Sequence, residues 1–278
     1  MSAALLYGLV ILSAIAHPIW NAMVKSSGDR MLSMVAIRAT GLLIGLAALP
    51  FVDWPAPQSW KWLALTAAVH FAYYGLLIRS YGAGDMSVVY PLARGLAPLL
   101  TAAAALLLID EALSAGQLLA VGLISLGIVT LSLGAGARPE AVGFAVATGV
   151  AVASYSFLGG LGVRTAGTVL GFQAFLEIVT GLGMVGYAVL RRPRDLVVYV
   201  RRHAATGLLA GVISVLGFLA FLVAALHLPL GPVTALRETS VVFGAVIGTV
   251  ILKEGFGPRR IAASALVVSG IVLLAMPR

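Results

Sequence analysis

Hydrophobic residues fall into about ten runs along the chain, and each run is close to the ~20 residues that an α-helix needs to cross a bilayer. The runs are 3–25, 31–51, 60–81, 86–109, 114–133, 139–163, 168–190, 204–226, 231–252 and 258–276. Ser114 and Gln117 have the spacing of a capping box for the fifth run, and Pro258 suits the first turn of the tenth. The pattern predicts an all-α integral membrane protein with about ten transmembrane helices.

Composition strengthens this class assignment. The chain is 61% hydrophobic and only 10% charged, with a mean hydropathy of +1.06, so a soluble protein of this size would lack the polar residues to cover its surface. Cysteine is absent, which excludes disulfides and thiolate chemistry. The net charge of +8 lies between the apolar runs, where it indicates membrane topology rather than nucleic-acid binding. The first run contains His17-Pro18 and has no charged leader, so we expect a span rather than a cleaved signal.

Two stretches, 87–111 and 230–254, share one design. Each has an arginine about two turns in, then an apolar run, then an acidic end. The offset along the chain from Arg94 to Arg237 equals the offset from Glu111 to Glu254 and the offset from Gly127 to Gly270. A constant offset over two helices predicts a duplication into five-helix repeats, residues 1–134 and 135–278. Because five is odd, the two copies must have opposite orientations in the membrane, which is the inverted-repeat plan of secondary carriers.

The first helices of each half show a second, weaker register with a slightly smaller offset. In this register His17 is equivalent to Ser156, Lys25 to Arg164 and Arg38 to Glu177.

Lysine and arginine counts predict the orientation. The odd-numbered connections hold twelve basic residues, whereas the even-numbered connections and the C-terminus hold three. The positive-inside rule therefore puts the odd connections in the cytoplasm and both termini outside the cell inner membrane. The basic segment 191–203 is expected to be a loop at the inner leaflet, near anionic headgroups.

The chain resembles the EamA-type transporters of the drug/metabolite transporter superfamily. The resemblance rests on the two five-helix repeats, on the acidic ends IDEAL (109–113) and LKEGF (252–256), and on AHPIWNAMVK (16–25) in the first helix. It implies a carrier of small metabolites with the third, fourth, eighth and ninth helices around a central cavity, and the fifth and tenth at the periphery. Members are commonly drawn with cytoplasmic termini, which disagrees with the charge count.

Arginine inside the membrane is costly and usually faces a cavity or a partner. Arg94 and Arg237 lie at equivalent points of the two repeats, so we expect them to approach one cavity and to hold a carboxylate or phosphate. Glu238 would balance their charge. The structural alternative is that each arginine pairs privately, Arg237 with Glu238 for example.

Arg38 and Glu177 are expected to form a buried ion pair if the weaker register holds, as a gate or as a structural pair. Glu177 and Glu238 are also the candidate carriers of a coupling proton, because they are the carboxylates within spans.

Polar and aromatic side chains share helix faces in several runs. His17 and Asn21 stand at i and i+4, with Trp20 beside them, and His70 lies near Tyr73 and Tyr74. The candidate substrate-binding residues are Arg94, Arg237, Glu238, His17, Trp20, Asn21, His70, Tyr74, Tyr90 and Tyr155. The candidate gating or coupling residues are Arg38, Glu177 and Glu238. Tyrosine and tryptophan also serve as packing residues and interface anchors, so either role is open for each.

Three glycine pairs have GxxxG spacing, which indicates close helix packing: Gly41/Gly45, Gly207/Gly211 and Gly244/Gly248. The string from Gly82 to Asp85 matches the GxGD of intramembrane aspartyl proteases. We do not expect an enzyme, because that chemistry needs paired carboxylates and the other aspartates fall in loops or helix ends. No metal or cofactor motif is present, and neither metal nor cofactor is expected.

The sequence therefore predicts a secondary-active transporter, an exporter or exchanger, of a small organic metabolite with an anionic group between Arg94 and Arg237. The alternatives are an exporter of amino acids or cationic drugs with structural arginines, a channel, and, most remotely, an intramembrane enzyme using the turn from Gly82 to Asp85. Expected partners are the metabolite, membrane lipid and a proton as coupling ion, with no nucleic acid. Monomer and homodimer are both left open.

Overall fold

The chain is helical in nearly all of the residues that the computed structural model describes, which are 1–84, 86–132, 138–243 and 258–275. The α-helices are α1 (Ala3–Ser26), α2 (Arg30–Ala48), α3 (Trp60–Ala83), α4 (Met86–Ile109), α5 (Ala115–Ser132), α6 (Pro139–Ala166), α7 (Val169–Arg191), α8 (Pro193–His227), α9 (Leu230–Glu238) and α11 (Pro258–Ala275). Two 3-10 turns, Leu49–Phe51 and Pro57–Ser59, connect α2 to α3. The all-α class is confirmed for this part of the chain.

Seven of the described helices are long and apolar enough to cross a bilayer: α1, α2, α3, α4, α6, α7 and α8. Helix α5 is a shorter apolar helix. Large apolar side chains such as Leu43, Leu107, Leu108 and Leu190 are exposed on the outside of the bundle, while arginine and glutamate side chains are buried inside it. Apolar side chains outside and charged side chains inside are the reverse of the arrangement in a soluble protein, and they fit lipid as the surrounding solvent. The chain is a multi-pass membrane protein.

Local sequence signals set the helix ends. The Gln117 side chain accepts from the Ser114 N–H at 3.0 Å, and the Ser114 hydroxyl accepts from the Gln117 N–H at 3.3 Å, so the expected capping box is present. Helix α11 begins at Pro258 as expected. Helix α6 ends at Gly167, whose φ of +72° is the left-handed conformation that favours glycine.

Two expected boundaries were wrong. Segment 191–203, expected as a loop, is largely the first part of α8, because Pro193 occupies the first turn and the chain stays helical through a bend at His203 (φ −127°, ψ 17°). The ninth run, expected as one helix over 231–252, is interrupted after Glu238. The Thr239 N–H turns back to the Leu236 carbonyl at 3.2 Å, and helical backbone resumes at Ser240.

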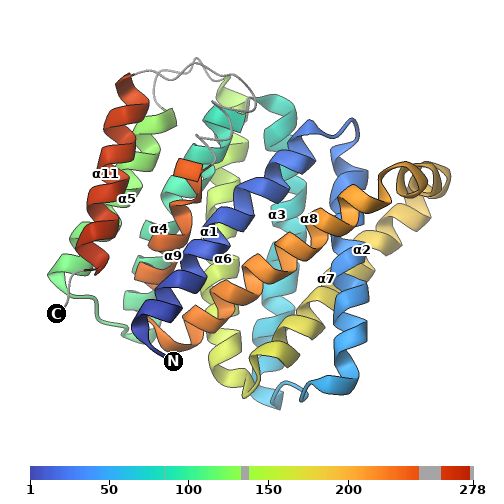
Figure 1. The fold of residues 1–278 in the computed structure, drawn as a ribbon, viewed down its shortest axis with the longest axis horizontal. Helices are drawn as coiled ribbons and strands as arrows, with labels where there is room; N and C mark the ends of the chain where they lie inside the picture. The colour runs from blue at the N-terminus through green and yellow to red at the C-terminus, as the bar shows by residue number, and fades with distance from the viewer. Residues whose placement is uncertain (85, 133–137, 244–257, 276–278) are drawn as a thin grey trace.

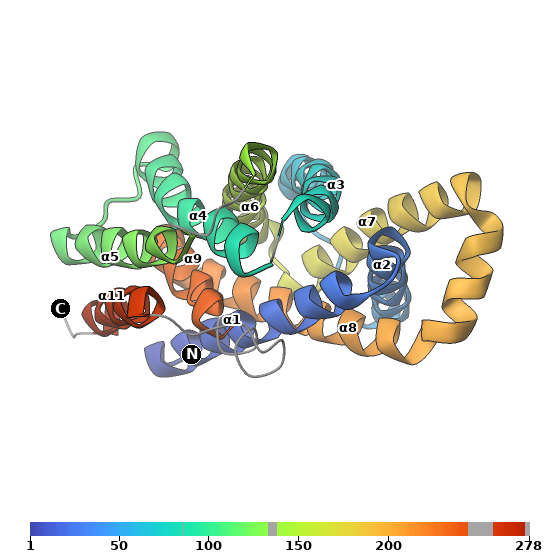
Figure 2. The ribbon, with the colours of Figure 1, turned by 90° about the horizontal axis from the view of Figure 1, so that it is seen from above.

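The helices pack as long neighbouring pairs (Figures 1 and 2). Helix α1 packs along α8 and α3 along α6, while α2 contacts both α7 and α8. Helix α4 contacts α5, α6 and α9. Helices α5 and α11 lie side by side at one edge of the bundle, and the connection between α7 and α8 is at the opposite edge. The peripheral place implied for the fifth and tenth helices is therefore confirmed.

Glycines allow α2 to approach α7 closely. A Cβ at Gly41 would collide with the carboxylate of Glu177, and one at Gly45 would lie 2.7 Å from the Ala174 carbonyl oxygen. The predicted packing role of this GxxxG pair is confirmed, and it gives the Glu177 side chain its space.

The second GxxxG pair brings α8 against α2. A Cβ at Gly207 would lie 2.8 Å from the Ala36 methyl group, and one at Gly211 would collide with the Thr40 side chain. Here too close packing is confirmed. The third pair, Gly244 and Gly248, lies outside the described residues.

Candidate substrate site

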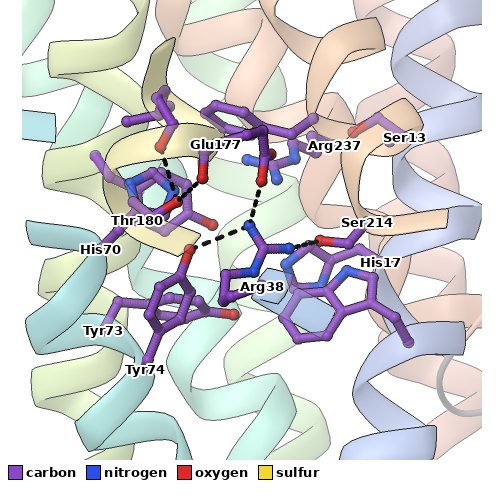
Figure 3. A pocket seen from close by; sticks show the side chains of 15 residues that line it. Ser13, His17, Arg38, His70, Tyr73, Tyr74, Glu177, Thr180, Ser214 and Arg237 are labelled. Atoms are coloured by element: carbon purple, nitrogen blue, oxygen red, sulfur yellow. Dashed lines mark hydrogen bonds and ion pairs between the residues drawn. The ribbon is translucent and has the colours of Figure 1, made fainter. Parts of the chain in front are cut away.

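Side chains from seven helices line a cavity of about 30 Å³ (Figure 3). The space holds about two or three water molecules and is far below the ~300–1,000 Å³ of a small-molecule pocket, so a metabolite would need the site to widen. Helices α3, α8 and α9 line it, as the resemblance implied. Helix α4 supplies none of the lining side chains, whereas α1, α2, α6 and α7 do. The lining residues are Ser13, His17, Trp20, Arg38, His70, Tyr73, Tyr74, Tyr155, Leu176, Glu177, Thr180, Ser214, Gly217, Phe218 and Arg237.

A buried ion pair crosses one side of the cavity. Arg38 Nη1 lies 2.9 Å from Glu177 Oε2, and the pair joins α2 to α7 (Figure 3). Arg38 Nη2 donates to the Ser214 hydroxyl at 2.6 Å, and Nη1 also reaches the Tyr74 hydroxyl at 3.3 Å. The second Glu177 oxygen accepts from the Gln173 amide at 2.8 Å. The predicted contact between Arg38 and Glu177 is confirmed.

A second buried ion pair joins α4 to α9. The Arg94 guanidinium contacts the Glu238 carboxylate through Nε, and both side chains are almost fully buried. The structural alternative in which Glu238 pairs with Arg237 is not the arrangement found. Adjacent residues of a helix point about 100° apart, so Glu238 faces α4 while Arg237 faces the cavity.

Arg237 is the cavity's unpaired cation among the described residues. Its guanidinium lies over the rings of Phe221 at 4.6 Å, Phe218 at 5.5 Å and Tyr155 at 5.8 Å. The side chain is buried, yet Nε and Nη1 donate no hydrogen bond to any described residue. Cation–π contacts stabilise the charge of Arg237 by roughly 0.5–2 kcal/mol. They do not use the N–H groups of Nε and Nη1, so these groups can still donate to an acceptor.

The count of buried charges gives the site a net positive charge. The buried arginine and glutamate side chains in the described ranges are three arginines and two glutamates. Arg38 is paired with Glu177, and Arg94 with Glu238. One positive charge, that of Arg237, has no counterpart in these ranges. An unpaired charge in a low-dielectric interior is costly, so this arrangement favours an anionic ligand.

His17 connects the cavity wall to the buried pair behind it. Its Nε2 lies 3.4 Å from Arg94 Nη1, and its Nδ1 lies 2.9 Å from the Asn21 amide nitrogen. The Tyr90 hydroxyl lies 3.2 Å from the same Nδ1 and donates to Ser240 at 3.0 Å. The Asn21 amide donates to the His17 carbonyl at 2.8 Å.

Aromatic rings form the wall beside Arg237. The His70 ring stacks on Tyr155 with centroids 4.4 Å apart, and its Nδ1 lies 2.8 Å from the Thr66 carbonyl, to which it donates. Tyr73 packs edge-on to Tyr155 at 5.2 Å. The Trp20 ring lies 4.9 Å from His17. These contacts hold the wall in one conformation.

The structure thus divides the predicted site residues into two groups. Those on the cavity wall are His17, Trp20, Arg38, His70, Tyr74, Tyr155, Glu177 and Arg237. Those behind it are Asn21, Tyr90, Arg94 and Glu238, because each of these side chains contacts a neighbouring helix or its own helix instead. The sequence reasoning missed Ser13, Leu176, Thr180, Ser214, Gly217 and Phe218, and noted Tyr73 only as part of a helix face. The available signal was the helical spacing of Ser214, Gly217 and Phe218.

A polar contact closes the end of the bundle where α4 stops. Asp110 has a φ of +49°, and the Glu111 N–H turns back to the Ala105 carbonyl at 3.1 Å, so the chain leaves α4 through a left-handed residue. Glu111 then accepts from Arg164 Nη1 at 2.7 Å and from the Leu230 N–H at the start of α9. The acidic residue that ends the fourth run therefore ties α4, α6 and α9 together.

Similar contacts hold the two ends of the bundle. Arg164, at the end of α6, donates to the Ala225 and Leu228 carbonyls at the end of α8, at 2.9 and 2.8 Å. Lys25, at the end of α1, donates to the Tyr81 and Gly84 carbonyls at the end of α3, both at 2.9 Å. Asp85 and Glu254 lie outside the described residues.

Comparisons with known proteins agree with this fold. The chain is 27% identical over 242 residues to Protein RarD of Streptomyces exfoliatus, covering 84% of this chain and 75% of that protein. A solved crystal structure is similar over 97% of this chain and 98% of its own, with a TM-score of 0.73 and 17% sequence identity, which shows the fold alone. No family model matches the chain.

Proposed function

We propose that the protein is a secondary-active transporter of the EamA type that moves a small organic anion across the cell inner membrane by alternating access. Arg237 binds the anionic group of the substrate. The observation that carries this proposal is the buried guanidinium of a cavity-lining arginine whose Nε and Nη1 donate no hydrogen bond to a described residue. Transport, rather than mere binding, is favoured because a carrier must expose and enclose such a site in turn.

Inverted repeats are part of the proposal, and several contacts support them. If each helix is equivalent to the one five places on, α1 corresponds to α6 and α3 to α8. The packing of α1 on α8 then matches the packing of α6 on α3. The weaker register equates Lys25 with Arg164, and the offset along the chain between their acceptors is the same for both pairs, Tyr81 to Ala225 and Gly84 to Leu228. Arg38 and Glu177, equivalent in the same register, contact each other, as residues across a twofold axis would.

Helix direction supports ten crossings. Helix α1 begins and α11 ends on the same face of the bundle (Figure 1), as an even number of spans requires. In this scheme the Arg164 contacts close one face and the Lys25 contacts close the other, so an alternating carrier would have to break one set at a time. The odd connections are placed in the cytoplasm by their basic residues.

A ligand screen tests the anion site. The melting temperature of the purified protein in detergent would be measured against organic monocarboxylates, phosphate monoesters, amino acids and organic cations. We expect stabilisation by monoanions, and affinity at least tenfold weaker in Arg237→Lys, which keeps the charge but loses the planar fork. Arg192→Lys, at a partly exposed position far from the cavity lining, is the matched control. Stabilisation by cations, with unchanged affinity in Arg237→Lys, would favour the drug-exporter alternative instead.

A further inference from the structure

We propose that the Arg237 cavity is also a site for one small inorganic anion of the chloride class, bound in the closed conformation. In the transport cycle that rests on the function proposed above, this anion takes the position of the substrate's anionic group. The two ligands therefore exclude each other.

The fully buried polar atoms of the lining residues that lack a partner are all able to donate. They are Arg237 Nε and Nη1, Arg38 Nε, the Tyr73 hydroxyl and the Ser13 hydroxyl, and none has a hydrogen-bond partner in the described part of the chain. Glu177, the carboxylate of the lining set, has both oxygens engaged, by Arg38 and Gln173. Several free donors, beside a carboxylate whose oxygens are both engaged, favour an anion over a cation.

The charge balance selects a single negative charge. Arg237 is the one buried arginine of the described ranges without a glutamate partner. A monovalent anion completes the balance, whereas a second negative charge would itself be unpaired in a low-dielectric interior. Sulfate and the phosphate dianion are disfavoured for this reason.

The size of the cavity limits the ion to one of a few atoms. A space of about 30 Å³ accommodates about two or three waters, which is enough for one halide, because a halide is close to a water molecule in size. An organic carboxylate needs the cavity to widen. The closed conformation consequently favours the halide, and a more open one favours the metabolite.

Trp20 gives a direct optical test because it lines the cavity and is buried. In a variant with Trp54, Trp60 and Trp62 replaced by phenylalanine, Trp20 is the remaining tryptophan. Bromide, a heavy-atom quencher of the same class as chloride, would be titrated at constant ionic strength with gluconate as the replacing anion. We expect saturable quenching of Trp20 that chloride reverses. Arg237→Gln in this background should raise the half-saturating bromide concentration at least tenfold, and Arg192→Gln should not change it.

Quenching that is linear in bromide, or saturable to the same degree with Arg237→Gln, would overturn the halide site. If Arg237→Gln does not fold, Tyr73→Phe removes one donor and should still weaken the bromide response. The two proposals fail separately. Halide binding that no organic anion displaces would support the halide site and refute the carrier's anion site. Arg237-dependent binding of an organic anion without a halide response would support the carrier's anion site and refute the halide site.

Discussion

Removing Arg38 alone is expected to destabilise the protein more than removing Arg38 and Glu177 together. The ion pair is 2.9 Å long, and the two side chains are only 6% and 4% exposed. Arg38→Met leaves the Glu177 carboxylate buried with only the Gln173 amide as partner, which should cost about 3–5 kcal/mol. Glu177→Met leaves the guanidinium with Ser214 and Tyr74 and should cost about the same.

The double variant removes both charges. The groups that lose a partner are the Gln173 amide and the Ser214 and Tyr74 hydroxyls, which should cost about 1–3 kcal/mol together. The sum of the two single costs should therefore exceed the cost of the double variant by at least about 3 kcal/mol. Reversible unfolding of the purified protein in mixed micelles, titrated with sodium dodecyl sulfate, measures all three free energies of unfolding.

The matched control is the surface pair of Arg192 and Asp29. Its atoms are 2.7 Å apart, but the side chains are 37% and 27% exposed, so Arg192→Met should cost less than about 1 kcal/mol. Asp29 and Asp195 hydrogen-bond to this guanidinium and raise the pKa of Arg192, so it stays charged at any working pH. The reasoning about burial is refuted if Arg38→Met costs no more than this control, or if the double variant costs the sum of the singles.

Three further predictions follow from packing, topology and coupling. Gly211→Ala should destabilise by about 1–3 kcal/mol in the same titration because its Cβ would collide with Thr40, whereas Gly8→Ala, with no atom within 4 Å, should be neutral or stabilising. With no natural cysteine, a cysteine at exposed Gln58 should react with an impermeant maleimide in intact cells and one at exposed Gly28 should not, and the opposite pattern rejects the predicted orientation. Glu238→Gln should lose pH-driven uptake in proteoliposomes but retain substrate exchange, and an unaltered pH dependence would make Glu238 structural.

Much of the fold was predictable because lipid restricts what a chain can do. A bilayer accepts continuous helices, so the apolar runs, the Ser114–Gln117 box and Pro258 were enough to place most helix ends. The boundary at 204 failed because arginines in 191–203 were taken as a sign of a loop. A helix at a membrane surface carries the same residues, and Pro193 begins helices as readily as it ends them.

The candidate site was predictable as a set of residues, but not as a set of pairs. Because a charge inside the membrane is costly, five charged residues within the apolar runs could be selected from the sequence alone, and all five are buried: Arg38, Arg94, Glu177, Arg237 and Glu238. Which carboxylate meets which guanidinium depends on the rotation of each helix about its axis. The spacing of residues along the chain does not determine that rotation. Of the two ion pairs, the weaker register predicted only the one between Arg38 and Glu177.

In the proposed site, the pairing of Glu238 with Arg94 sets the charge expected of the ligand. Two free arginines would suit a dianion, whereas the pair leaves Arg237 alone and suits a monoanion. Protonation of Glu238 would release Arg94 and raise the buried excess from one positive charge to two. Binding of a second negative charge is thereby linked to uptake of one proton. Affinity for a disulfonate relative to a monosulfonate, whose charges do not change with pH, should therefore rise as the buffer is made more acidic. The ratio should become independent of pH in Glu238→Gln. A ratio that is already constant in the unaltered protein would mean that Arg94 stays paired throughout, and that the site takes one negative charge at every pH.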